Sequence, residues 1–264
     1  MRPHEMDLET MLRRLHLPTI RRLCRELEQR AESEQMSYCD YLAVLVAEEI
    51  AHRAQTRITR SVRKGQFPFL GTIEDFDFTF QSSIKLQLLG SFLGPELVSE
   101  GRSLIFSGPT GTGKTRLAIA IAYRAIQNGF EARFTTADEL IGELSSAARR
   151  GHLEEALEPY VHPHVLVIDE LGYLPLPGEA ASALFQVVSQ RYLKTSIVLT
   201  TNRGVASWGE VLGDTTVAAA MLDRLLHRSV VLNLDVDSYR LRDHHARTDT
   251  LRRATTGNTR RPLS

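Results

Sequence analysis

The octapeptide Gly108–Thr115 constrains the fold of this chain more than any other segment. It reads G-P-T-G-T-G-K-T and matches the G-x-x-x-x-G-K-[ST] pattern of a phosphate-binding loop. Leu104–Phe106 just before it predicts a short buried strand, and apolar residues recur at helical spacing over Leu117–Ala122. A loop between a strand and a helix N-terminus points successive backbone N–H groups at a polyphosphate. We therefore interpret this segment as a nucleotide-binding loop rather than a chance glycine-rich turn.

Each residue of the loop has an expected role. The glycines allow the tight turns that bring the backbone close to the phosphates. Lys114 would reach the β- and γ-phosphates, and the Thr115 hydroxyl would bind Mg²⁺. The expected nucleotide ligands in this segment are Gly108, Pro109, Thr110, Gly111, Thr112, Gly113, Lys114 and Thr115.

Polar side chains also follow two later strands. Val165–Ile168 is a continuous apolar run, typical of a parallel strand buried on both faces, and it ends in Asp169 and Glu170. We expect Asp169 to bind the nucleotide and hold Mg²⁺ with Thr115, and Glu170 to orient an attacking water. Asn202 follows the strand Ile197–Thr201, where its amide can contact the γ-phosphate or that water, although asparagine is also a common turn residue.

The composition is that of an intracellular enzyme. The 264 residues are 42% hydrophobic and 24% charged, enough for a main domain with a sizeable core and a smaller accessory one. No apolar run approaches the length of a membrane span, and the first residues lack the core of a signal peptide. Cys24 and Cys39 do not have metal-ligand spacing. We expect a cytoplasmic location and no membrane partner.

The first 64 residues predict a small all-helical domain, and Pro18 begins its second helix. In the third helix, four basic residues lie on one face at spacings of four, three and four, and no acidic residue occurs between Ile50 and Ile73. Such a stripe predicts contacts with nucleic-acid phosphates; a solvated helix face is the alternative. The residues are Arg53, Arg57, Arg60 and Lys64.

The rest of the chain predicts a connector over residues 65–100, an α/β domain over 101–243 and a disordered basic tail over 244–264. Strands alternate with helices in the α/β domain, which predicts a parallel five-stranded sheet covered on both sides. One helix begins with a capping box at Thr136 and Glu139 and ends at Arg149 and Arg150. These two arginines suit a helix C-terminus electrostatically.

Several longer strings resemble the IstB-like ATPases, which are AAA+ helper proteins of bacterial insertion sequences related to the DnaC-type helicase loaders. The resemblance covers residues 8–242. Besides the phosphate loop, its most specific strings are I-D-E-L-G-Y-L-P-L at Ile168–Leu176 and L-D-R-L-L-H at Leu222–His227, supported by T-N-R at Thr201–Arg203, W-G-E at Trp208–Glu210 and S-Y-R at Ser238–Arg240.

The resemblance implies an ATPase that assembles as a homo-oligomer on double-stranded target DNA and recruits and stimulates a partner transposase or integrase. Lys114 and Thr115 match the Walker A positions, and Asp169 and Glu170 match the Walker B pair. Asn202 matches the sensor position. Arg224 stands where AAA+ proteins place an arginine finger for the neighbouring subunit's ATP, with Arg228 as the alternative. Arg149 and Arg150 fall in a segment that resembles a DNA-facing insertion.

Two other interpretations stay open. A replicative helicase loader of the DnaC type would act on a hexameric helicase instead of a transposase. A nucleotide-switched DNA clamp would bind ATP with little hydrolysis. The sequence also departs from most AAA+ proteins, because the stretch after Leu234 is too short and polar to form a C-terminal helical lid.

Overall fold

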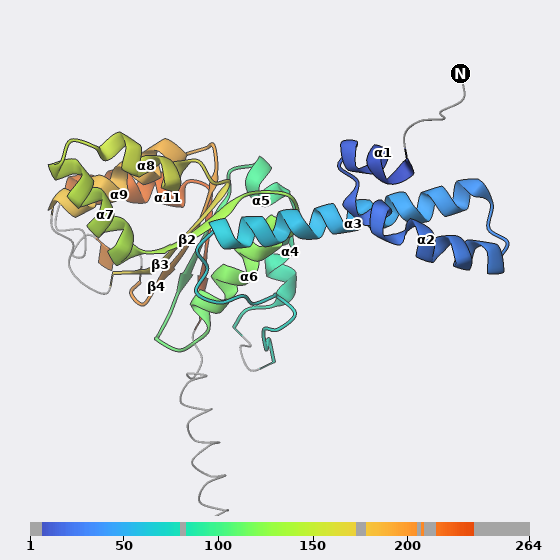
Figure 1. Cartoon of the computed structure of the whole chain (residues 1–264). Coiled ribbons are helices and arrows are strands. Elements are labelled where there is room, and N and C mark those ends of the chain that lie inside the picture. The colour runs from blue at the N-terminus through green and yellow to red at the C-terminus, as the bar shows by residue number, and fades with distance from the viewer. Residues whose placement is uncertain (1–6, 80–82, 173–177, 205–206, 209–214, 235–264) are drawn as a thin grey trace, which may run out of the picture. The chain divides into compact units, whose positions relative to one another are not determined.

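The computed structural model describes residues 7–79, 83–172, 178–204, 207–208 and 215–234 (Figure 1). The expected absence of a helical lid and the expected disorder of residues 244–264 therefore lie outside the described residues. The chain divides into two compact units, residues 1–60 and 61–264. The domain boundaries at 64, 100 and 243 stay predictions. No helix in the described part of the chain is long and apolar enough to cross a membrane.

The N-terminal unit contains α1 (Leu8–Arg14), α2 (Pro18–Ser33) and most of α3 (Tyr38–Lys64). Pro18 is the first residue of α2, where its fixed φ angle suits a helix start. The Ser37 hydroxyl caps α3 by accepting a hydrogen bond from the Asp40 backbone N–H at 3.2 Å. The small core of this unit is formed by Leu12, Ile20 and Leu45.

A buried carboxylate fastens α3 to the start of α2. Oε2 of Glu49 accepts hydrogen bonds from the backbone N–H groups of Thr19 and Ile20, at 2.8 and 3.2 Å, and Oε1 accepts one from Nε of Arg53 at 3.0 Å. Burial tends to raise the pKa of Glu49, but these hydrogen bonds outweigh it and hold the pKa below its ordinary value. Glu49 therefore satisfies donors that the first turn of α2 would otherwise leave unpaired.

The second unit contains a five-stranded, all-parallel sheet with the strand order β2-β3-β4-β1-β5, which confirms the predicted α/β architecture. The carboxyl ends of parallel strands all lie at the same side of the sheet. The polar residues predicted to act together lie at three of these ends: the glycine loop after β1, Asp169 and Glu170 at the end of β3, and Asn202 after β4. The strands are β1 (Ser103–Ser107), β2 (Ala132–Thr136), β3 (Val165–Leu171), β4 (Ser196–Thr201) and β5 (Ser229–Asn233).

Helices lie on both sides of this sheet (Figure 1). α6 packs against β1 to β4 and is joined on its side by α4, whereas α7, α9 and α11 pack together on the other side. The predicted capping box is present at the start of α7, where the side chains of Thr136 and Glu139 each bond the other's backbone N–H. The helices are α4 (Leu86–Leu93), α5 (Glu96–Ser99), α6 (Lys114–Gln127), α7 (Ala137–Arg149), α8 (Leu153–Val161), α9 (Gly178–Arg191) and α11 (Thr215–Leu226).

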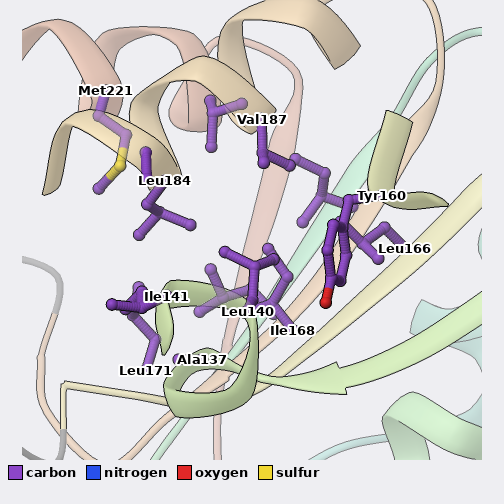
Figure 2. Packing of buried hydrophobic residues seen from close by; sticks show 14 of the residues in the cluster. Ala137, Leu140, Ile141, Tyr160, Leu166, Ile168, Leu171, Leu184, Val187 and Met221 are labelled. Atoms are coloured by element: carbon purple, nitrogen blue, oxygen red, sulfur yellow. The ribbon is translucent and has the colours of Figure 1, made fainter. Parts of the chain in front are cut away.

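The core on the α7 side fixes the carboxyl edge of the sheet (Figure 2). Leu140 of α7, Leu184 of α9 and Met221 of α11 meet there against Leu166 and Ile168 of β3, and all five are fully buried. Because Ile168 directly precedes Asp169, this packing holds the end of β3 in a fixed place.

Arg191 at the end of α9 is 1% exposed, and its guanidinium group donates only to backbone carbonyl oxygens among the described residues. These hydrogen bonds join α9 to the segment before β3 and to the start of β4. Burial lowers the pKa of Arg191 to about 9. The acceptors are the carbonyl oxygens of Tyr160, Val161, Pro163, His164 and Ser196.

We expect Arg191→Met to destabilise the second unit by at least about 3 kcal/mol, because several buried carbonyl oxygens lose their donor together. Urea-induced unfolding measures the loss. The control is Lys194→Met, since Lys194 is exposed and should change stability by less than about 0.5 kcal/mol. Equal stability of the two variants would contradict this role of Arg191.

Candidate nucleotide site

The glycine loop follows β1 directly and adopts the backbone that its sequence predicts. Gly108, Gly111 and Gly113 have φ angles of 147°, 86° and 93°, in the region that favours glycine. A Cβ at Gly108 would lie 2.2 Å from the carbonyl oxygen of Leu234, so no larger residue fits there without movement of the backbone. The N–H of Gly108 bonds the carbonyl oxygen of Thr201 at 3.3 Å, which ties the loop to the end of β4.

Lys114 at the first position of α6 points back at this loop. Its side chain is 9% exposed, and Nζ donates to the carbonyl oxygens of Gly108 and Pro109 at 2.7 and 2.6 Å. The Thr112 hydroxyl also donates to the Pro109 carbonyl, at 3.0 Å. The loop therefore holds a buried ammonium group at a helix N-terminus, an arrangement that suits a polyphosphate.

The two predicted metal ligands are in direct contact. The Thr115 hydroxyl lies 2.9 Å from Oδ1 and 3.0 Å from Oδ2 of Asp169. Mg²⁺ is usually held by one or two protein carboxylates together with phosphate oxygens, and this pair fits that pattern. Among the described residues there is no group of three or more His, Cys, Asp and Glu side chains with metal-binding geometry.

Glu170 lies at an irregular point in β3. Ile168 pairs with Leu199 and Leu171 pairs with Thr201, so Asp169 and Glu170 together face the single residue Thr200. Glu170 has a φ angle of 62°, which is unusual for a residue with a side chain, and it is exposed. Strained backbone of this kind is concentrated at functional sites. The bulge turns the acidic side chain towards solvent at the carboxyl edge of the sheet.

Asn202 follows β4, which lies between β1 and β3 in the sheet. Its Oδ1 atom is buried and has no hydrogen-bond partner among the described residues. A buried acceptor without a partner costs about 1–3 kcal/mol, so it marks a place where another polar group fits. The sensor role of Asn202 stays a prediction.

The two candidate finger arginines lie near the amino-terminal ends of the strands, whereas the glycine loop lies at the carboxyl-terminal ends. Arg228 directly precedes β5, its carbonyl oxygen accepts from Ser103 N–H at the start of β1, and its Nη1 donates to the Glu100 carbonyl at 3.0 Å. Arg224 lines a small hollow with Gly101 and Ser103 at the same end of β1. The Arg224 guanidinium stacks on the Phe185 ring, 4.6 Å from its centroid, and has no acidic partner among the described residues. The glycine loop follows the other end of β1, a five-residue strand that spans about 13 Å from its first to its last Cα.

The predicted DNA-binding residues differ in their surroundings. Arg53 bonds Glu49 and the His16 carbonyl oxygen, and Lys64 pairs with Glu131 at 3.2 Å. The remaining four are exposed, and within the described part of the chain none has an acidic partner within 4 Å; they are Arg57, Arg60, Arg149 and Arg150.

Two residues near the predicted site residues, Thr200 and Phe185, were given no role from the sequence. Thr200, inside the strand that leads to Asn202, bonds both Asp169 and Glu170. Phe185 of α9 lies under the Arg224 guanidinium. A buried polar residue at the end of the apolar run Ile197–Leu199 was a signal for Thr200, but its partners are about thirty residues away in the sequence.

The glycine loop, the contact between Thr115 and Asp169 and the parallel sheet together define a phosphate-loop nucleotide-binding protein with the AAA+ fold. A comparison with known families gives the particular group. The family described as IstB-like ATP binding protein matches residues 10–247, and the chain belongs to this family.

Two curated relatives are proteins of insertion sequences. The ATP-binding protein of IS5376 from Geobacillus stearothermophilus is 40% identical over 230 residues, which cover 87% of this chain and 92% of that protein. The ATP-binding protein of IS21 from Pseudomonas aeruginosa is 37% identical over 237 residues, which cover 90% and 89%.

The solved structure of AMPPCP-bound DnaA from Aquifex aeolicus has a TM-score of 0.54 and 21% identity, and the match covers 64% of this chain and 52% of that one. This likeness concerns the AAA+ fold alone.

Proposed function

We propose that this chain is a DNA-binding ATPase of the cytoplasm that assembles on double-stranded target DNA and recruits and stimulates the transposase of its insertion element. The observation that carries the ATPase proposal is the contact of Thr115 with Asp169 beside the buried amino group of Lys114. The partner and the DNA are inferred from the insertion-sequence relatives.

Hydrolysis would be the in-line attack of water on the γ-phosphorus, which breaks the bond to the β,γ-bridging oxygen and gives ADP and phosphate. Bound Mg²⁺, held by Thr115 and Asp169, would neutralise charge on the phosphate oxygens. Glu170 orients the attacking water, and Lys114 stabilises the negative charge of the β- and γ-phosphates. Asn202 offers its side-chain amide to the γ-phosphate or to the water.

The ATP site is proposed to be shared between subunits. Arg224 lies beyond the amino end of β1, whereas the glycine loop follows its carboxyl end, so Arg224 does not serve its own loop. The Arg224 guanidinium lies over the Phe185 ring and forms no ion pair with a described acidic residue, so its N–H donors can serve a phosphate. This arrangement favours Arg224 over Arg228, which already donates to a backbone carbonyl.

DNA binding is proposed to depend on phosphate contacts of Arg57, Arg60, Arg149 and Arg150, which are exposed and have no acidic partner among the described residues. Arg53 and Lys64 stay candidates, but each has an acidic partner in its own unit. Contacts of this kind give affinity with little sequence preference.

We expect Arg57→Gln with Arg60→Gln to weaken DNA binding and to reduce the slope of log K against log salt by about 2, because each lost phosphate contact contributes about 0.9. Fluorescence anisotropy with a labelled duplex at several salt concentrations measures both quantities. The control is Arg30→Gln, since Arg30 is exposed but paired with Glu34. An unchanged slope would make this part of the stripe an ordinary solvated helix face.

The experiment that tests the proposed function compares ATP turnover with and without duplex DNA, and then adds the transposase of the proposed insertion element. DNA-stimulated turnover and capture of that transposase are expected. Tight ATP-dependent DNA binding with almost no turnover would favour the nucleotide-switched clamp. Capture of a replicative helicase in place of the transposase would favour a helicase loader.

A further inference from the structure

Thr200 is placed at the point where the two acidic residues of the site meet. It lies in β4, 1% exposed, opposite the bulge formed by Asp169 and Glu170. Its hydroxyl donates to Oδ1 of Asp169 and accepts the backbone N–H of Glu170 at 2.9 Å. One buried hydroxyl group thus contacts both acidic residues at once.

The two contacts restrict different features of the site. The bond to Asp169 fixes the carboxylate from the side of β4, whereas Thr115 contacts it from α6. The bond to the Glu170 N–H holds the peptide that enters the left-handed conformation at φ 62°. The Glu170 side chain is exposed, so the backbone conformation, rather than packing against neighbours, sets the direction in which it points.

We propose that Thr200 is a positioning residue of the ATPase site, which sets the Asp169 carboxylate and the Glu170 backbone relative to each other. This inference rests on the proposed function. Thr115 would turn from Asp169 towards a bound metal ion, but Thr200 is held in the middle of the sheet and keeps both of its bonds. The distance between the metal-binding carboxylate and the water-orienting one is therefore set by β4.

The test is Thr200→Val, which keeps the shape of the side chain and removes the hydroxyl group. Loss of a group that orients a metal ligand typically lowers metal affinity or activity about 10- to 100-fold. We expect a rise of this size in the Mg²⁺ concentration that half-saturates binding of a fluorescent ATP analogue, and a similar fall in kcat. Nucleotide binding without Mg²⁺ should stay close to that of the parent.

Two variants separate positioning from general destabilisation. Thr200→Ser keeps the hydroxyl group and should restore the Mg²⁺ dependence of the parent. Thr201→Val removes the next hydroxyl group of the same strand. Thr201 is 0% exposed, and among the described residues its hydroxyl bonds only the backbone of Arg203. This variant should lower the melting temperature to a similar extent without a change in Mg²⁺ dependence. Equal Mg²⁺ dependence of Thr200→Val and the parent would overturn the proposal.

Hydrogen exchange in the parent protein gives an answer even if Thr200→Val does not fold. The Glu170 amide should exchange slowly, with or without Mg²⁺ and nucleotide, although its side chain is exposed. Fast exchange of this amide would overturn the proposal. If the parent binds Mg²⁺-nucleotide but does not hydrolyse it, the proposed ATPase function fails, and the Mg²⁺ titration still tests Thr200.

Discussion

Lys114→Ala will weaken ATP binding by at least about 100-fold, since the ammonium group would make charge-assisted contacts with two phosphates and each is worth about 1.5–3 kcal/mol. Nζ of Lys114 lies 2.7 Å from the Gly108 carbonyl oxygen, so its charge is already held at the loop. If assembly on DNA requires ATP, the same variant will lose stable assembly. Titration with a fluorescent ATP analogue and the mass of the DNA-bound complex measure the two losses.

Glu170→Gln is the matched variant, because it changes the side chain proposed to orient the water and leaves the proposed phosphate contacts in place. It should bind ATP like the parent, hydrolyse it about 10²–10⁴-fold more slowly, and hold the assembled state on DNA. The two variants should therefore differ in binding and assembly. If both bind ATP equally well, the roles assigned to Lys114 and Glu170 are wrong.

The nucleotide end of the sheet could be predicted from the sequence because its signals are local. The strand, the glycine loop and the helix that follows are consecutive in the chain, and the loop pattern contains the residues with positive φ angles. Parallel strands then bring Asp169 and Asn202 to the same edge of the sheet without any further information. The helix caps at Ser37 and Thr136 were predictable for the same reason, since each depends on residues three positions apart.

Contacts that depend on register or packing between distant segments could not be predicted. The bond between Thr200 and the Glu170 N–H exists because β3 bulges against β4, and no short-range pattern in either strand marks that bulge. Arg53 matched the basic stripe by spacing and bonds Glu49 four residues earlier in α3, but its bond to the His16 carbonyl depends on how the connection between α1 and α2 packs against α3. Spacing gives the face of a helix and does not say which neighbour will cover it.

Arg224→Ala will bind ATP nearly as well as the parent and hydrolyse it slowly. An arginine finger contributes on the order of 10³–10⁵ in rate, so kcat should fall by a factor in that range while the fold is retained. The retained fold is expected because the contact of the guanidinium group with the Phe185 ring is worth only about 0.5–1 kcal/mol at such a site. ATP turnover, analogue binding and the melting temperature are the three measurements. The matched control is Arg228→Ala, which should keep most of the parent turnover.

Mixing subunits decides whether Arg224 acts on a neighbour's ATP. Glu170→Gln subunits bind ATP and keep Arg224 but cannot turn over their own nucleotide, whereas Arg224→Ala subunits keep Glu170 and lack the arginine. Neither variant is active alone. An interface with ATP on an Arg224→Ala subunit and the arginine from a Glu170→Gln subunit has every group, so the mixture should recover part of the parent rate. A mixture that stays inactive while its subunits co-assemble would show that Arg224 is not supplied in trans. If Arg224→Ala alone hydrolyses ATP at the parent rate, Arg224 has only a structural role on the Phe185 ring, and Arg228 becomes the candidate arginine finger.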